Sequence, residues 1–289
     1  MKTFMRSLWQ RVGKHASEPA RSLSQARPDT IDLIGPDYDT TGGDVAERTL
    51  IICAAPRTGS YELCRLLVAG GVGIPHEYFH PQYSQTAASR WGMSGDPLRE
   101  DNIAAYIDLL RRNRVQGGVF ATKIQFWQFN ACLRNCHGAA LFKNASIVHV
   151  FRSDVVRQFK SMRVAMVTGR YDFSARASRP PQPDSVEDAL KALDFLLEED
   201  AGLRRLFVLL GASPLFITTD DIVDRPRETV ALIAQSAGVR VDEAGLDRML
   251  ATSTPYARDT QTEQQVADTI NALGAFAFQS SAKRSSGEE

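Results

Sequence analysis

The stretch that most constrains the fold is an apolar run that leads directly into a glycine-containing turn and a helix. Residues 49–54 read TLIICA, the turn at residues 55–60 reads APRTGS, and residues 62–70 read ELCRLLVAG. The first run has the length of a buried strand, while the last segment has helical spacing and ends at a glycine. A strand, a tight loop and a helix in this order are typical of open α/β proteins, which bind anions at such a loop.

The same alternation of strand and helix recurs along the chain. We predict further strands at residues 119–123, 146–151 and 215–219, each followed by a helical segment, and these segments end near residues 135, 167 and 238. Two more helices are expected over residues 98–112 and 185–210. Strands that alternate with helices predict a parallel sheet covered on both faces. The expected fold class is therefore α/β, a single domain with a P-loop-like central parallel sheet and helices on both faces.

The composition fits one such domain within 289 residues. Hydrophobic residues make up 43% of the chain and charged residues 24%, and 34 basic residues balance 34 acidic ones. A formal net charge of zero argues against a protein that wraps nucleic acid, so we expect no nucleic-acid partner. We place the domain at residues 46–279, after an N-terminal extension (1–45) expected to be flexible and before a disordered tail (280–289).

The sequence shows no segment that would span a membrane or direct export. Its apolar stretches are far shorter than the roughly 18 residues that a spanning helix needs, and the basic N-terminus lacks a signal-peptide core. Phe4, Leu8 and Val12 share one helical face, so this stretch is either a loose terminus or a surface helix on an anionic membrane. We expect a cytoplasmic protein, with peripheral contact at the inner membrane face as an option.

The cysteine pattern argues against disulfides and metal. The chain has four cysteines, Cys53, Cys64, Cys132 and Cys136, and an intracellular protein of this length with so few rarely forms disulfide bonds. Cys132, Cys136 and His137 stand close together, but no second ligand pair has zinc-site spacing. We therefore predict packing thiols, a reducing compartment and no metal.

The turn after the first strand lacks the parts that metal-dependent nucleotide hydrolysis needs. Aligned on G-x-x-x-x-G-K-[ST], Gly59 takes the place of the second glycine, whereas Ser60 replaces the lysine and Tyr61 the magnesium-binding hydroxyl. What remains is an anion cradle of Arg57, backbone N–H groups and small hydroxyls. Such a cradle suits an anionic group whose transfer needs no metal, for example the sulfuryl group of 3'-phosphoadenosine 5'-phosphosulfate.

Several motifs in order resemble the bacterial carbohydrate sulfotransferases of the trehalose and lipopolysaccharide type. The family's P-R-T-G-S loop corresponds to residues 56–60 and its P-x-E-[FY]-F motif to residues 75–79. The similarity continues at GVFATKIQFWQ (118–128) and IVHVFRSDVVRQFKSM (147–162), and spans roughly residues 50–267. It implies 3'-phosphoadenosine 5'-phosphosulfate as co-substrate, a carbohydrate or glycolipid acceptor and, by family precedent, homodimers.

The resemblance implies that the loop binds the phosphosulfate end of the donor. Arg57 would pair with phosphate oxygens and take part in catalysis, and Thr58, Gly59, Ser60 and Tyr61 would complete the cofactor site. The alternative is that the loop is only a structural turn. In the first reading, the backbone N–H groups of the turn complete the anion cradle.

A second set of residues resembles the family's clamp on the 3'-phosphate of the nucleotide. Arg152 ends a predicted strand and Ser161 lies on the following helix. Relatives commonly have a basic residue one place after the arginine, where this chain has Ser153. On a helix Ser153, Arg157 and Ser161 share a face, so Arg157 either supplies the missing charge or is an ordinary solvated side chain.

Glu77 matches the glutamate of the P-x-E-[FY]-F motif, which by resemblance is the general base for the acceptor hydroxyl. The flanking residues Pro75, Tyr78, Phe79 and Pro81 predict partial burial and a raised pKa. The alternatives are that Glu77 is a solvated side chain, or that one of the neighbouring histidines at positions 76 and 80 is the base.

Four residues are candidate contacts for the acceptor, namely His76, Arg90, Trp91 and Lys123. Lys123 ends the second predicted strand at its carboxyl end, where ligands bind in such sheets, and it matches a lysine of a family strand motif. Arg90 and Trp91 follow the loop of the candidate base and suit stacking on a carbohydrate ring. A charged strand end is also an ordinary structural feature, so Lys123 has both readings.

The sequence therefore predicts a metal-independent sulfotransferase that acts on a carbohydrate or glycolipid hydroxyl, with Glu77 as general base. The alternative is a non-catalytic nucleotide- or glycan-binding protein on the same fold, motivated by Ser153 and Tyr61. A kinase-like phosphotransferase is disfavoured because the loop lacks the lysine and the magnesium-binding hydroxyl. Acceptor specificity is expected in the loops at residues 81–98 and 169–184.

Overall fold

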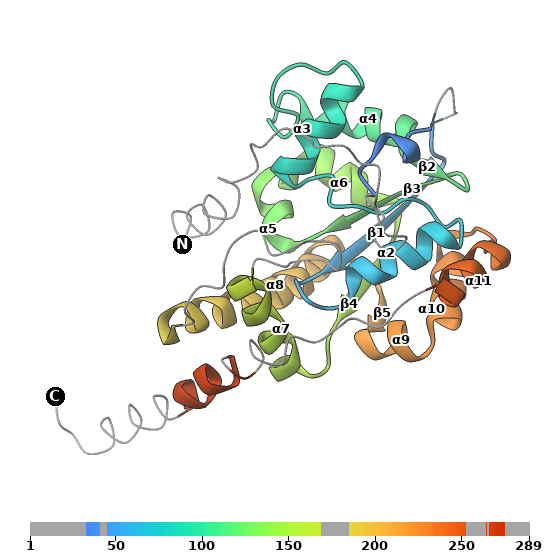
Figure 1. The fold of residues 1–289 in the computed structure, drawn as a ribbon. Helices are drawn as coiled ribbons and strands as arrows, with labels where there is room; N and C mark the ends of the chain where they lie inside the picture. The colour runs from blue at the N-terminus through green and yellow to red at the C-terminus, as the bar shows by residue number, and fades with distance from the viewer. Residues whose placement is uncertain (1–32, 41–44, 169–184, 253–263, 265, 275–289) are drawn as a thin grey trace, which may run out of the picture.

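The centre of the fold is a five-stranded sheet with strand order β2-β3-β1-β4-β5 (Figure 1). The structure is a computed structural model that describes residues 33–40, 45–168, 185–252, 264 and 266–274. The strands are β1 (Arg48–Ala54), β2 (Val115–Gln116), β3 (Val119–Ile124), β4 (Ala145–Phe151) and β5 (Leu215–Thr218). β1 pairs in parallel with β3 and β4, and β4 with β5, whereas the short β2 is antiparallel to β3. The α/β class is confirmed, and β2 is an edge strand that the sequence did not predict.

Helices cover both faces of this sheet, as predicted (Figure 1). Apolar side chains on one face pack against α4, α6 and α8, and those on the other face pack against α2, α10 and α11. The helices are α2 (Ser60–Ala69), α3 (Pro81–Arg90), α4 (Ile103–Asn113), α5 (Phe126–Gln128), α6 (Cys136–Lys143), α7 (Val155–Thr168), α8 (Val186–Leu210), α9 (Thr219–Asp224), α10 (Pro226–Ala237) and α11 (Glu243–Thr252). A 3₁₀-helix, η1 (Pro36–Tyr38), precedes β1, and a π-helical turn, η2 (Phe129–Leu133), follows α5.

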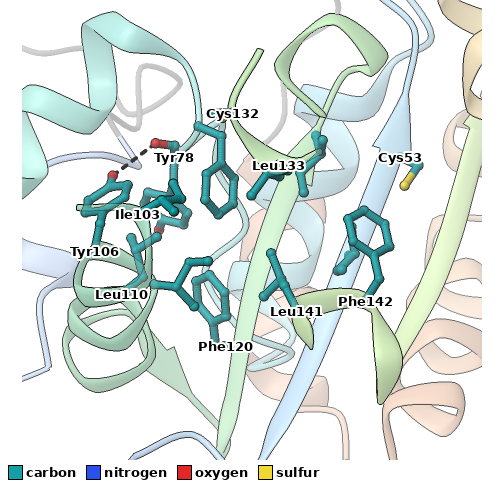
Figure 2. Close-up of a cluster of buried hydrophobic side chains, with 14 of the residues drawn as sticks. Cys53, Tyr78, Ile103, Tyr106, Leu110, Phe120, Cys132, Leu133, Leu141 and Phe142 are labelled. Carbon is teal, nitrogen blue, oxygen red and sulfur yellow. Dashed lines mark hydrogen bonds between the residues drawn. The ribbon is translucent and has the colours of Figure 1, made fainter. Parts of the chain in front are cut away.

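The apolar run at β1 is continuous because both of its faces are buried. Ile51 and Cys53 belong to one hydrophobic cluster, whereas the alternate residues Leu50 and Ile52 belong to the other. Figure 2 shows the first cluster, in which the hydroxyl of Tyr106 donates a hydrogen bond to the carbonyl of Tyr78 at 3.0 Å. This contact anchors the segment that carries Glu77 to the core.

Local polar contacts decide where several helices begin. The predicted helix at 185–210 is correct to within one residue, because the side chain of Ser185 accepts the N–H of Asp188 as an N-cap. The helix predicted from residue 98 instead begins at Ile103. Asp96 holds the preceding turn, since it accepts the N–H of Leu98 at 2.9 Å and its carbonyl accepts the side chain of Asn102 at 2.8 Å.

The helical segment predicted from the end of β3 to residue 135 is wrong as a single element. It divides into α5 and η2, and α6 then begins behind the N-cap Asn135, whose side chain accepts the N–H of Gly138 at 2.9 Å. A Cβ at Gly138 would lie 1.9 Å from the carbonyl oxygen of Leu133. The close approach of the two backbones at this point separates the turn from α6.

Part of the expected N-terminal extension packs on the domain. Leu33 is buried, and the fully buried guanidinium of Arg114 donates to the carbonyls of Leu33 and Gly35. The same guanidinium donates to Asp39 Oδ1 at 2.9 Å. The expectations for residues 1–32, including the helical face of Phe4, for the loop at 169–184 and for the tail at 280–289 fall outside the described residues.

Strand order fixes where a ligand would bind. β1 lies between β3 and β4, so the chain passes from β1 to one side and then crosses back to the other. Ligands of open α/β sheets bind at the carboxyl ends of the strands at such a switch point. The loop at residues 55–60, Lys123 and Arg152 all lie at that edge, at or directly after the ends of β1, β3 and β4.

Candidate active site

The loop between β1 and α2 has an unusual backbone. Arg57 and Gly59 both have positive φ values, +66° and +76°, and Arg57 is the one non-glycine residue in this region among those described. Gly59 is the N-cap of α2, and Thr58 Oγ1 donates to the carbonyl of Ala55 at 3.0 Å. A non-glycine residue with positive φ costs free energy and is typical of functional sites. The bend presents the N-terminus of α2, which attracts anions.

Three arginines and a serine gather beside this loop. Arg57 Nε donates to Ser161 Oγ at 3.0 Å, and a guanidinium N–H of Arg152 lies 3.5 Å from the carbonyl oxygen of Arg57. Burial, and then the positive charge of Arg157, lower the pKa of Arg152 from its ordinary value. The predicted clamp residues Arg152, Arg157 and Ser161 thus lie near Arg57 of the predicted loop, while Ser153 is exposed. Such a concentration of positive charge suits a phosphorylated ligand.

Two residues that the sequence analysis did not select hold the loop from outside. Gln158 Nε2 donates to the carbonyl of Pro56 at 2.8 Å, and Thr219 Oγ1 donates to the carbonyl of Thr58 at 2.9 Å. They belong to α7 and α9, which lie far along the chain. Gln158 lies within the family-like segment 147–162, but its contact with the loop, like that of Thr219, depends on the three-dimensional fold.

Glu77 lies in a small pocket at the same edge of the sheet. The cavity is about 110 Å³, and its lining residues are Tyr61, Cys64, Pro75, His76, Glu77, Tyr83 and Lys123. Glu77 Oε1 accepts from Lys123 Nζ at 2.5 Å. Glu77 Oε2 accepts from the side-chain amides of Gln125 at 3.0 Å and Gln128 at 2.7 Å. Three donors therefore fix the carboxylate in one orientation.

The charge state of Glu77 differs from the prediction. Burial acts to raise its pKa, but the charge and hydrogen bond of Lys123 outweigh burial and lower the pKa to about 2. The expected raised pKa is wrong, because the flanking sequence predicts burial of Glu77 but not its partner Lys123 on β3. Glu77 is therefore ionised at neutral pH and has lone pairs that can accept a proton, although the low pKa makes it a weak base.

The two histidines near Glu77 are neutral. Burial lowers the pKa of His76 to about 3, although the charge of Glu77 acts in the other direction. Burial also lowers the pKa of His80, whose Nδ1 accepts the N–H of Gln82 at 3.2 Å. His76 lines the cavity with Glu77, and its Nδ1 is buried without a hydrogen-bond partner.

A known protein family matches the part of the chain that contains the loop at residues 55–60, Glu77 and the clamp residues. Residues 49–265 match the family described as Stf0 sulphotransferase. The chain belongs to the Stf0 sulphotransferase family. The resemblance noted in the sequence is confirmed, and membership of the family makes the chain a sulfotransferase, an enzyme of sulfuryl transfer. The family implies a sulfate donor.

Among solved structures, one sulfotransferase domain shows a weaker similarity to this chain. The sulfotransferase domain from the Synechococcus PCC 7002 olefin synthase is similar over 80% of this chain and 98% of that domain, with 15% sequence identity and a TM-score of 0.41. No curated protein matches this Stf0 chain.

Arg90 and Trp91 do not lie in the pocket of this Stf0 protein. Arg90 donates to both carboxylate oxygens of Asp39, at 2.9 and 3.0 Å, and Trp91 Nε1 donates to Asp39 Oδ2 at 3.0 Å. Neither residue lines the cavity beside Glu77. Both bind the segment that precedes β1, so stacking on an acceptor sugar stays a prediction that these contacts do not favour.

Gln125 and Gln128 are the site residues that the sequence analysis missed. Gln125 is the N-cap of α5 and Gln128 its last residue, and the pair forms a capping box. A polar residue repeated three positions later is a recognised helix-start pattern. Here it follows a fully buried strand at its carboxyl end, which is where such sheets bind ligands. A helix-start pattern directly after a buried strand was therefore the sequence signal that could have identified Gln125 and Gln128 as site residues.

The described part of the chain shows no group of three or more His, Cys, Asp or Glu side chains placed to hold a metal ion. The four cysteines are free; three are buried, and Cys136 is exposed. No described helix is both long and apolar enough to cross a membrane.

Proposed function

We propose that this protein transfers the sulfuryl group of 3'-phosphoadenosine 5'-phosphosulfate to a hydroxyl group of a carbohydrate or glycolipid. The observation that carries the proposal is the adjacency of an anion cradle and an ionised carboxylate. Tyr61 in the first turn of α2 lines the cavity of Glu77, and the residues directly before it form the cradle. A donor in the cradle and a hydroxyl at Glu77 would therefore meet at the carboxyl edge of the sheet.

The residues present fit a nucleotide with phosphate groups at two positions. Arg57 and the backbone N–H groups at the start of α2 suit the 5'-phosphosulfate, because both are donors to anionic oxygens. Arg152, Arg157 and Ser161 suit the 3'-phosphate, and the position of Arg157 beside Arg152 offers the charge that Ser153 lacks. The donor supplies the activated sulfuryl group, and these side chains bind and orient it.

Glu77 would serve as the proton acceptor of this transfer. The hydroxyl oxygen of the acceptor forms a bond to sulfur while the bond from sulfur to the phosphate oxygen breaks, and that oxygen keeps the electron pair. The hydroxyl proton passes to Glu77. A carboxylate with a pKa of about 2 is a weak base, but the proton becomes strongly acidic as the new S–O bond forms, so a weak base is sufficient late in the reaction.

Removal of the Glu77 carboxylate tests the catalytic part of the proposal. Glu77→Ala should abolish sulfate transfer from labelled 3'-phosphoadenosine 5'-phosphosulfate to trehalose or a lipopolysaccharide fraction, while binding of 3'-phosphoadenosine 5'-phosphate is retained. The exposed Glu100 offers the matched control, Glu100→Ala, which should keep wild-type rates. A Glu77→Ala enzyme that still transfers sulfate at the wild-type rate refutes the role of Glu77.

Donor identity is tested by a thermal-shift titration. A ligand at about 100 times its dissociation constant stabilises by roughly 2.7 kcal/mol. We expect a shift with 3'-phosphoadenosine 5'-phosphate, independent of magnesium, and none with ATP or adenosine monophosphate. Binding without turnover on any acceptor would support the non-catalytic nucleotide- or glycan-binding alternative, and absence of a shift would contradict the proposed donor.

Two further proposals concern the surroundings of the enzyme. A homodimer is expected from the family precedent, and light scattering of the purified protein tests it. Contact with an anionic membrane is proposed if the acceptor is lipid-linked, because the N-terminal stretch is basic. Flotation with anionic liposomes tests this contact, and unchanged binding after deletion of residues 1–15 would contradict it.

A further inference from the structure

Helix α8 contacts the candidate active site through a carboxylate that the proposed reaction does not use. Glu199 is 1% exposed, and its two oxygens accept the N–H groups of two consecutive residues. Oε2 accepts from Phe126 at 2.8 Å and Oε1 accepts from Trp127 at 2.9 Å. Both N–H groups belong to the first turn of α5, so Glu199 fixes the start of this short helix.

The turn that Glu199 holds carries the two amide donors of Glu77. Gln125 is the N-cap of α5 and Gln128 is its last residue. Both side-chain amides donate to Glu77 Oε2. A displacement of the turn would therefore move both donors together, and with them the orientation of the carboxylate.

The turn also determines which end of each glutamine amide faces Glu77. The side-chain oxygen of Gln125 accepts from Trp127 Nε1 at 3.0 Å, and the side-chain oxygen of Gln128 accepts the backbone N–H of Gln125 at 3.1 Å. Because both oxygens have donors, the NH₂ groups are the ends that point at the carboxylate. The orientation of both amides thus depends on the geometry of α5.

A glycine on α8 lets the helix approach the turn closely. A Cβ at Gly202 would lie 2.1 Å from Cδ1 of Phe126. Gly202 lies three positions after Glu199, so the two residues share one face of α8. Glycine inside a long helix lowers helix stability, and here it allows the aromatic ring of α5 to pack directly on the helix backbone.

We propose that Glu199 is a positioning residue for the sulfotransferase reaction, which acts through α5 to hold the amides of Gln125 and Gln128 against Glu77. This inference rests on the proposed role of Glu77 as proton acceptor. Glu199 touches neither donor nor acceptor in this scheme. Its effect should therefore appear in the rate of transfer and not in the binding of the nucleotide.

The contacts of Glu199 do not require it to be ionised. Burial raises the pKa of Glu199 to about 8, and the two backbone N–H groups offset part of that rise. A protonated carboxyl group still has acceptor capacity on both oxygens. Replacement by glutamine instead turns one acceptor into an NH₂ donor that would face a backbone N–H, so Glu199→Gln tests the contact in either charge state.

The main experiment compares Glu199→Gln with Glu198→Gln, its exposed neighbour on the same helix. We expect Glu199→Gln to lower kcat at least tenfold, with the dissociation constant for 3'-phosphoadenosine 5'-phosphate and the KM of the donor within twofold of wild type. Glu198→Gln should match the wild type. A wild-type kcat in Glu199→Gln, or an equal loss in nucleotide binding, would overturn the proposal.

A second variant decides the matter if Glu199→Gln does not fold. Trp127→Phe keeps an aromatic ring but removes the indole N–H that orients Gln125. It should lower kcat several-fold with nucleotide binding unchanged, and a wild-type kcat would contradict the inference.

Failure of the proposed function would show itself differently, as a wild-type protein without turnover on any acceptor. The link between Glu199 and Glu77 is then read from melting temperatures. The double variant Glu77→Gln/Glu199→Gln should lose less than the sum of the two single losses, because both substitutions disturb the same turn. Additive losses would overturn the link.

Discussion

Replacing Lys123 by methionine isolates the ion pair that holds Glu77. The side chains of Lys123 and Glu77 are 10% and 17% exposed, so the substitution leaves a largely buried carboxylate with Gln125 and Gln128 as its partners. The pKa of Glu77 is about 2 instead of 4.5, and at about 1.36 kcal/mol per unit this difference corresponds to roughly 3 kcal/mol of stability at neutral pH. Loss of one partner of a buried pair typically costs about 3–5 kcal/mol.

The assay is urea unfolding at pH 7, followed by tryptophan fluorescence, for wild type, Lys123→Met, Glu77→Gln and the double variant. We expect Lys123→Met to lower the free energy of unfolding by about 3 kcal/mol, or the melting temperature by roughly 6–12 °C. The loss of unfolding free energy in the double variant should be at least about 2 kcal/mol smaller than the sum of the losses in the two single variants. Lys160 is exposed on α7, and the control Lys160→Met should change stability by less than about 0.5 kcal/mol.

The contribution of the Lys123–Glu77 pair to the free energy of unfolding should fall as the pH is lowered. Because folding lowers the pKa of Glu77 from 4.5 to about 2, the ionised pair contributes its full stability above pH 4.5 and loses it as the pH falls toward 2. The difference between wild type and Lys123→Met should therefore shrink over that window. Equal stability of the two proteins at pH 7, additive energies in the double variant, or a difference that grows on acidification would refute this reasoning.

Two further predictions concern the loop and the segment before β1. Gly59→Ala should weaken binding of 3'-phosphoadenosine 5'-phosphate in a thermal-shift titration, because φ at Gly59 is +76° and a Cβ there strains the cradle. The control is Gly92→Ala, at a glycine with the same φ and no atom near its Cβ position. Equal binding by the two alanine variants would contradict the prediction. Asp39→Ala should lower the free energy of unfolding by about 3–5 kcal/mol, because the fully buried Arg114 loses its carboxylate partner. Asp37→Ala, at an exposed site, should have little effect. Similar urea midpoints for the two variants would argue against a stabilising Asp39–Arg114 pair.

The sequence predicted the layers of the fold well because the strands of the sheet centre are rich in apolar residues and several long helices have recognisable ends. β1, β3 and β4 lie where their apolar runs predicted them. α8 begins directly after its serine cap and α10 begins at Pro226, where proline is favoured. The two-residue β2 was missed, because an element of that length carries too little periodicity to be detected. The helices α3, α9 and α11 were also not predicted.

The site was only partly predictable for a different reason. Arg57, Arg152 and Ser161 were selected from family motifs and Arg157 from helical spacing, and the structure brings them together. The charge state of Glu77 depends on Lys123, 46 positions away in the sequence, and such a pairing leaves no local pattern.

The contacts to Asp39 illustrate the same limit. Arg114 reaches this carboxylate across 75 positions and Arg90 across 51. Flanking residues predict burial, whereas a partner from a distant segment is set by the three-dimensional fold.

The three donors on Glu77 have a consequence for product chemistry. A carboxylate offers about four lone-pair positions, and Lys123, Gln125 and Gln128 each take one. One direction then remains for an incoming hydroxyl group. A sugar carries several hydroxyl groups of similar acidity, so intrinsic reactivity does not select among them. A base that accepts from a single fixed direction does select, and the proposed enzyme should be regioselective and form one monosulfated isomer from a polyhydroxylated acceptor.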